Sequence, residues 1–222
     1  MSPVDAAASY RDLTLGAFVD QLASPEPVPG GGSASAVAAA LAAALVAMVA
    51  SLSEGRPKYV EHAELHAASR GIGQRLAGRF LDLADEDAAA YAAFAAAMKL
   101  PKATEPEQAI RRAALSAAAR IASEVPLRTV EACLELIASA ESLVGRSNVN
   151  ASSDLDVAVL LGEAAARGAA ANVLINLPSV DDETYSGEAT ARVMATLDSI
   201  KEIAHTVHLG VRSGGPRDPL PA

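Results

Sequence analysis

The feature that most constrains the fold is an uncharged, alanine-rich run from Ala34 to Leu52, which directly follows the segment Pro29 to Ser33. Alanine is the best helix former and loses no side-chain entropy in a helix. A helix of this length without charge must be buried on most sides, in a protein core or in a membrane. Alanine adds little insertion energy, and serines flank the run, so we expect a buried central helix and no membrane partner.

The glycine triplet Gly30, Gly31 and Gly32 predicts a binding corner at the start of this helix. Glycine can adopt positive φ and lets a ligand approach without a Cβ in the way. Ser33 is a good N-cap, and a helix N-terminus favours a carboxylate, a carbonyl or a ring oxygen as ligand. The alternative is a flexible linker. A phosphate loop is excluded because no Lys-Ser/Thr pair follows and no strand precedes.

Composition and the positions of helix-breaking residues predict an all-α fold, a single-domain helical bundle of roughly six to eight helices. The chain has 222 residues, 51% hydrophobic and only 3% aromatic, as expected of closely packed alanine-rich helices. No linker divides residues 1–209, and the glycine- and proline-rich residues 210–222 are expected to be a disordered tail. Besides the alanine-rich helix, helices are expected over about 15–23, 58–99, 105–141, 152–177 and 183–209.

Charge and cysteine content limit the partners and the location. The 18 basic against 27 acidic residues give a formal charge of -9, which disfavours nucleic acid. Cys133 is the only cysteine, so no internal disulfide forms. Met1 to Tyr10 lacks the pattern of a signal peptide, and we expect a cytoplasmic protein. His62 and His66 lie four apart among acidic neighbours, which predicts a solvated face and no metal site.

The acidic run Asp85, Glu86 and Asp87 lies within the otherwise apolar stretch Leu81 to Met98. Asp87 and Tyr91 are four apart and share a helical face, so a carboxylate lies beside a phenol, a plausible pair for moving protons. Asp85 precedes Asp87 by two residues in the same acidic run. The alternative is a solvated acidic turn, because charge runs usually face water.

Short polar side chains gather at both ends of one expected helix. Asn148, Ser153 and Asp154 crowd its start, and Asn172 and Asn176 repeat the i, i+4 spacing near its end. A buried amide left without a partner costs about 1 to 3 kcal/mol. These side chains therefore either cap helices and bond to neighbouring ones, or line a pocket.

Taken together and in order, six segments resemble the formiminotransferase-cyclodeaminase family, in its cyclodeaminase/cyclohydrolase domain. The segments are Pro29 to Ser33, Asp85 to Tyr91, Leu100 to Lys102, Val125 to Leu127, Ser153 to Leu155 and Asn172 to Leu177. The resemblance spans about Thr14 to Leu209. It implies an all-helical homodimer that acts on one-carbon adducts of tetrahydrofolate, with no cofactor beyond that substrate and no metal.

The resemblance also implies roles for particular residues. Asp87 matches the family's catalytic aspartate, Asp85 matches a second acidic position, and we expect Tyr91 to support Asp87. Lys102 and Arg112, with Arg111, are expected to pair with the glutamate tail of the folate. The positions expected to build the folate pocket are Pro29, Gly30, Gly31, Gly32, Ser33, Asn148, Ser153, Asp154, Asn172 and Asn176.

The expected activity is reversible hydrolysis of 5,10-methenyltetrahydrofolate to 10-formyltetrahydrofolate, because chains of this size look more like the family's cyclohydrolases. The alternative is a formimidoyltetrahydrofolate cyclodeaminase that releases ammonia and forms the methenyl compound. Both reactions pass through a tetrahedral carbon between two nitrogens and need one proton-shuttling group. A third hypothesis is a non-catalytic folate-binding or structural helical dimer.

Overall fold

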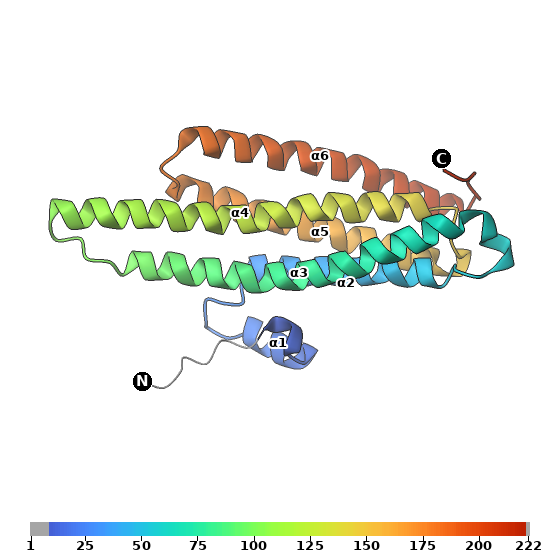
Figure 1. The fold of residues 1–222 in the computed structure, drawn as a ribbon, viewed down its shortest axis with the longest axis horizontal. Coiled ribbons are helices and arrows are strands. Elements are labelled where there is room, and N and C mark those ends of the chain that lie inside the picture. The colour runs from blue at the N-terminus through green and yellow to red at the C-terminus, as the bar shows by residue number, and fades with distance from the viewer. Residues whose placement is uncertain (1–8, 221–222) are drawn as a thin grey trace.

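The computed structural model describes residues 9–220, in which the long helices α2 to α6 run along one elongated bundle and the short helix α1 lies beside it (Figure 1). No strand occurs in this range, so the all-α prediction is confirmed. The helices are α1 (Leu15–Leu22), α2 (Gly31–Ser51), α3 (Ala63–Met98), α4 (Glu105–Leu143), α5 (Ser152–Asn176) and α6 (Glu183–Ser213). Short 3₁₀ turns are η1 (Tyr10–Asp12), η2 (Pro57–His62), η3 (Val149–Ala151) and η4 (Leu177–Ser179).

Four helices form a ring around the core. Helix α2 packs against α3 and α5, α4 closes the ring on the other side, and α6 lies over α4 and α5. Small residues allow the close approach: a Cβ on Gly73 of α3 would lie 2.7 Å from the carbonyl oxygen of Ala43 in α2. Gly73 therefore serves helix packing, and α3 continues through it.

Helix α2 is much shorter than its neighbours, which creates space at its N-terminus. It has 21 residues against 36 in α3 and 39 in α4, so α3 and α4 extend well beyond its start (Figure 1). Helix α5 runs antiparallel to α2, because Gly31 faces Asn172 and Gly168 faces Ser35. The start of α2 and the end of α5 therefore lie together near the middle of the bundle.

The last helix ends later than the sequence suggested. Helix α6 continues to Ser213, where Gly214 adopts a positive φ of 62°. Gly210, taken as the start of the tail, instead packs so closely that a Cβ would lie 2.4 Å from Val144. The expected boundary at residue 209 is wrong, because this glycine serves packing. Residues 214–220 lie against the end of α4, where the N–H of Arg217 donates to the carbonyl of Gly145 at 3.0 Å.

The region before α3 also differs from expectation. Helix α3 begins at Ala63, because Pro57 opens the separate turn η2. This turn buries His62 and His66, whose exposed fractions are 5% and 0%, so the predicted solvated face is wrong. The Nε2 of His66 lies 2.8 Å from the carbonyl oxygen of Arg146. No group of three potential metal ligands occurs within residues 9–220.

Two helical segments, Gly31–Ser51 and Val149–Ser179, are long and apolar enough to cross a membrane by length and composition. The bundle buries 56% and 44% of their most apolar windows. The buried part supplies the core of the protein, as expected for the alanine-rich helix. The exposed part is an apolar outer face on α2 and α5.

Candidate active site

A cavity of about 280 Å³ lies where α2 begins. Its walls come from the loop before α2 and from α3, α4 and α5. The lining residues are Pro27, Val28, Gly30, Gly31, Gly32, Asp87, Tyr91, Phe94, Ala122, Asn172, Ile175 and Asn176. The fold thus brings together the glycine triplet, Asp87, Tyr91 and both asparagines.

The carboxylate of Asp87 sits directly on the N-terminus of α2. Gly30 occupies the N-cap position and has no side chain to satisfy the free N–H groups there. The Ser33 hydroxyl lies 2.9 Å from Oδ2 of Asp87, to which it donates. Ser33 is therefore not the N-cap but a fully buried residue of the first turn. The cap comes from another helix.

Gly32 leaves the room that this contact needs. A Cβ on Gly32 would lie 2.2 Å from Oδ1 and 2.6 Å from Oδ2 of Asp87, far closer than atoms can pack. Gly31 has ordinary clearance, with 3.6 Å to Nδ2 of Asn172. None of the three glycines has positive φ, since those in residues 9–220 are Gly55, Gly145 and Gly214. The triplet therefore provides space rather than an unusual backbone conformation.

The environment of Asp87 suits a group that exchanges protons. Burial raises the pKa of Asp87, and hydrogen bonding from Ser33 lowers it only in part, so the pKa stays above the ordinary aspartate value. A carboxyl with a raised pKa takes up and releases protons more readily near neutral pH. Tyr91, one turn further along α3, lines the same cavity and is 39% exposed.

The two asparagines offer acceptors to a ligand. Nδ2 of Asn172 donates to the carbonyl of Gly168, and Nδ2 of Asn176 donates to the carbonyl of Ala122, each at 2.8 Å. Their side-chain oxygens have no hydrogen-bond partner within the described residues. Both roles considered from the sequence therefore apply, because each amide donates a hydrogen bond to a helix carbonyl and also lines the cavity. A ring N–H of a ligand would find an acceptor here.

Asp85 has a different position from Asp87. Its Oδ1 accepts from the backbone N–H of Tyr10 at 2.8 Å, and its Oδ2 accepts from the Ser9 hydroxyl. It is not among the residues that line the cavity. The structure thus assigns Asp85 to holding the segment before α1 against α3.

A basic depression of about 300 Å³ adjoins the cavity, since Phe94 lines both. Lys102, Arg111 and Arg112 line it. The Arg111 guanidinium donates to the carbonyl of Met98. Neither Lys102 nor Arg112 forms an ion pair with any residue in the described range. Asp181 also lines it, so three cations face one carboxylate and the depression is a local positive region on an acidic chain.

Comparison with known proteins identifies the family. Residues 14–195 match the profile described as formiminotransferase-cyclodeaminase. The chain belongs to this family. It is 37% identical to the methenyltetrahydrofolate cyclohydrolase of Methylorubrum extorquens, over 90% of this chain and 96% of that protein. It is 35% identical to the formimidoyltransferase-cyclodeaminase of Rattus norvegicus, of which it spans 37%.

A solved structure agrees with this family assignment. The crystal structure of formiminotetrahydrofolate cyclodeaminase from Thermotoga maritima superposes with a TM-score of 0.83 at 27% identity. The match covers 91% of this chain and 98% of that one. Both the fold and the sequence therefore support the family assignment over the region that contains the cavity described above.

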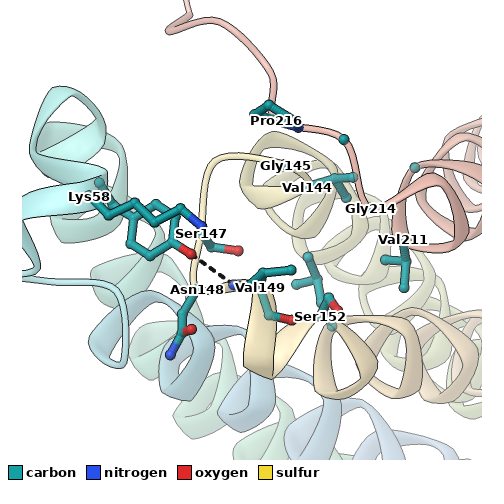
Figure 2. Close-up of a pocket in the computed structure, with 14 residues that line it drawn as sticks. Lys58, Val144, Gly145, Ser147, Asn148, Val149, Ser152, Val211, Gly214 and Pro216 are labelled. Atoms are coloured by element: carbon teal, nitrogen blue, oxygen red, sulfur yellow. Dashed lines mark hydrogen bonds between the residues drawn. The ribbon is translucent and has the colours of Figure 1, made fainter.

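Three of the expected pocket residues lie at the opposite end of the bundle. Asp154 and Asn172 are 18 residues apart on the straight helix α5, or about 27 Å at 1.5 Å per residue. Asn148 lines a separate pocket of about 150 Å³ with Tyr59, Val149 and Ser152, where the Tyr59 hydroxyl accepts from the N–H of Val149 (Figure 2). A single chain therefore does not bring Asn148, Ser153 or Asp154 to Asp87.

The apolar wall of the cavity was missed by sequence reasoning. Phe94 follows Tyr91 by three residues, and Ile175 follows Asn172 by three, so helical periodicity could have placed both near the predicted face. The loop residues Pro27 and Val28 gave no comparable signal. A flat ligand would find apolar contact on these side chains and polar contact on the asparagines.

The two glycines at the helix start differ in a testable way. We expect Gly32→Ala to lower the free energy of unfolding by about 2 to 3 kcal/mol, because its Cβ would displace the Asp87 carboxylate. Gly31→Ala is the matched control and should change it by less than about 1 kcal/mol. Chemical denaturation of both variants measures the difference. Equal effects would contradict the proposed steric role.

Proposed function

We propose that this protein is a folate one-carbon enzyme that hydrolyses 5,10-methenyltetrahydrofolate reversibly to 10-formyltetrahydrofolate. The supporting observation is the partly desolvated Asp87 carboxylate, held at the start of α2 in a cavity with two amide acceptors. The similarity to the Methylorubrum extorquens cyclohydrolase, over nearly the whole of both chains, favours this reaction.

The geometry supports a mechanism with one proton-shuttling group. Water attacks the methenyl carbon and forms a C–O bond, while Asp87 accepts a proton from that water. The tetrahedral carbon then lies between N5 and N10. Cleavage of the C–N5 bond, with transfer of the proton from Asp87 to N5, leaves the formyl group on N10. The remaining hydroxyl proton goes to solvent.

The site also suits a cationic substrate. The methenyl compound carries a delocalised positive charge, which the Asp87 carboxylate stabilises in a water-poor cavity. The oxygens of Asn172 and Asn176 accept hydrogen bonds from the pterin ring, and Tyr91 and Phe94 provide apolar contact. We assign Asp87 the role of general acid/base and Tyr91 a supporting role beside it.

The second candidate is the cyclodeaminase reaction, favoured by the likeness to the Thermotoga maritima structure. Here N10 of the protonated formimino compound attacks the formimino carbon and loses its proton to Asp87. The same proton passes to the amino group, which leaves as ammonia. The two reactions share the carbon, the tetrahedral geometry and the acid/base group.

An absorbance assay separates these reactions and tests Asp87. With purified protein, decay of the methenyl absorbance indicates hydrolysis, and its formation from the formimino compound indicates deamination. If the methenyl absorbance neither decays nor forms, the result would support a non-catalytic helical dimer. We expect Asp87→Asn to lower turnover at least about 100-fold.

The fold of this variant should remain intact. Because burial raises the pKa of Asp87, the ionised group is disfavoured in the folded state, and neutral asparagine removes that cost. The free energy of unfolding at neutral pH should not fall. In the unsubstituted enzyme, activity should decline as the pH falls through this raised pKa. Normal turnover by a folded Asp87→Asn protein would refute the assignment.

We further propose that the basic depression binds the glutamate tail of the folate. It adjoins the cavity through Phe94 and presents Lys102 and Arg112 without internal carboxylate partners in the described residues. A tail that leaves the pterin site across Phe94 would place its carboxylates beside these cations.

Substrates of different tail length test this site. Arg112→Ala should raise KM for a polyglutamylated substrate about threefold, the size of one exposed ion pair, and leave kcat unchanged. KM for the monoglutamate should change less. Arg212→Ala, which removes an exposed arginine at the far end of α6, is the control. An equal rise for both tail lengths would contradict tail binding.

We also propose a homodimer that uses the outer face of α2 and α5. Leu41, Met48 and Leu52 of α2 are 53%, 38% and 41% exposed, and no charged residue occurs in this helix. On α5, Val157 and Leu160 continue the apolar surface. Leu41 and Met48 are seven residues apart, and Leu52, the C-cap of α2, follows Met48 by four. Such spacing places them on one helix face and is typical of a seam that pairs with a like surface. A cytoplasmic location, without nucleic acid or membrane, stays a prediction.

Sedimentation velocity tests the dimer. Leu41→Glu places a charge at the centre of the α2 face and should convert the protein to monomers. Ile110→Glu is the control, because Ile110 is 65% exposed on α4, away from this face. A monomeric unsubstituted protein at micromolar concentration, or equal behaviour of the two variants, would contradict the proposal.

A further inference from the structure

The separate pocket of about 150 Å³ lies at the end of the bundle remote from Asp87 (Figure 2). Its walls come from η2, the segment between α4 and α5, the start of α5, the end of α6 and residues 214–216. The chain after α6 is held in place here, because the backbone N–H of Arg217 donates to the carbonyl of Gly145 at 3.0 Å and its side chain pairs with Glu141 at 2.7 Å. Specific contacts therefore fix every wall of this pocket.

Most of the pocket wall is apolar. The apolar side chains include Val144, Val149, Leu155, Val211 and Pro216, which come from four different segments of the chain. An apolar protein cavity of about 150 Å³ accommodates one benzene-sized group. The pocket therefore fits a single aromatic ring or a branched chain of similar size.

One buried polar group faces this space without a partner. Ser147 is 7% exposed and lines the pocket, and its hydroxyl forms no hydrogen bond with any residue in the range 9–220. Figure 2 shows this hydroxyl turned toward the space between the labelled side chains. The neighbouring backbone groups are satisfied, since the N–H of Asn148 donates to the Ser53 hydroxyl and that of Val149 donates to the Tyr59 hydroxyl. A buried hydroxyl without a partner is destabilising, so Ser147 indicates a ligand that bonds it.

The charges around the pocket favour an anion. Lys58 lines it and forms no ion pair within the part of the chain that the structure describes. The Lys58 Nζ lies 5.3 Å from the centre of the Tyr59 ring, which also lines the pocket, so the ammonium lies beside the opening. Ser152, the first residue of α5, turns the positive end of that helix toward the same space. Asp154 of the same helix turn is not among the lining residues, and no other described carboxylate is.

We propose that this pocket binds a small carboxylate that carries a benzene-sized apolar group. The apolar group lies among the valines and Leu155. The carboxylate lies at the opening, where the Ser147 hydroxyl donates to it and the Lys58 ammonium pairs with it. A whole folate molecule exceeds this volume, so the pocket is not a second substrate site. The proposal is independent of the folate reaction.

Calorimetric titration of the full chain with benzoate, benzyl alcohol and benzylamine tests the ligand class, because these compounds share a ring and differ in charge. We expect benzoate to bind with a Kd of about 1 mM, as is typical of a ligand with so few atoms. Benzyl alcohol should bind about tenfold more weakly, and benzylamine more weakly still, because Lys58 repels it. Equal binding of benzoate and benzylamine would overturn the proposal, as would no benzoate binding at about ten times the expected Kd.

Ser147→Ala tests the hydrogen bond. The Kd for benzoate should rise about tenfold, because a hydrogen bond to a charged group is lost. The melting temperature should not fall, since the removed hydroxyl has no partner in residues 9–220. Ser213→Ala is the matched control: its hydroxyl donates to the carbonyl of Gly210 near the pocket but does not line it, and the Kd should stay unchanged. Equal Kd values for the two variants would contradict the role of Ser147.

Lys58→Gln tests the charge. The Kd for benzoate should rise about threefold, the size of one exposed ion pair. Lys201→Gln, which removes an exposed lysine of α6 outside the pocket, is the control and should leave the Kd unchanged. An equal rise in both variants would show a general effect of net charge and contradict the site.

Nuclear magnetic resonance locates the bound benzoate. The backbone amide signals of Val149 and Gly215 should shift, and those of Gly31 and Asn172 should not. The opposite pattern would place benzoate in the Asp87 cavity and overturn the proposal. Val211→Phe fills the pocket and should abolish the shifts. If the protein catalyses neither folate reaction, the proposed function fails, and these titrations still decide whether the pocket binds a carboxylate.

Discussion

The carboxylate of Asp87 on the first turn of α2 is the contact on which the site depends. A helix N-terminus needs acceptors for its free N–H groups, and the chain around Gly30 provides none. Asp87 supplies the acceptor from α3, Gly32 leaves room for it, and the Ser33 hydroxyl donates to it. Burial opposes ionisation while the helix end favours it. One interaction thus joins two helices and sets the protonation state of the proposed acid/base group.

The sequence was sufficient for the helices and for part of the site. Alanine content, helix caps and proline positions act locally, so α1, α4 and α5 were placed closely. At the start of α4, for example, Thr104 and Glu107 form a capping box. Asp87 and Tyr91 met in the cavity because i, i+4 spacing is also local. Ser33 was misassigned because its partner comes from a distant helix. The same limit hid the burial of His66, which depends on contacts between remote segments.

Helix α5 shows a further limit of motif order. Its two polar ends both resemble family motifs, yet a rigid helix of 25 residues keeps them apart. Sequence order records that Ser153 and Asn172 belong to one pattern but not how far apart they lie. The exposed apolar face of α2 and α5 runs between these two ends. Residues from the two ends of α5 can therefore belong to one site only if a second bundle takes part.

The short length of α2 has a consequence for how such a pocket can diversify. Its floor is a helix end, and the cavity lies where another turn of that helix would have run. Lengthening or trimming α2 by one turn would change the depth of the cavity by about 5.4 Å while the packed layers beneath kept their side chains. Pocket size is therefore adjustable by moving a boundary in the chain, separately from the residues that stabilise the bundle.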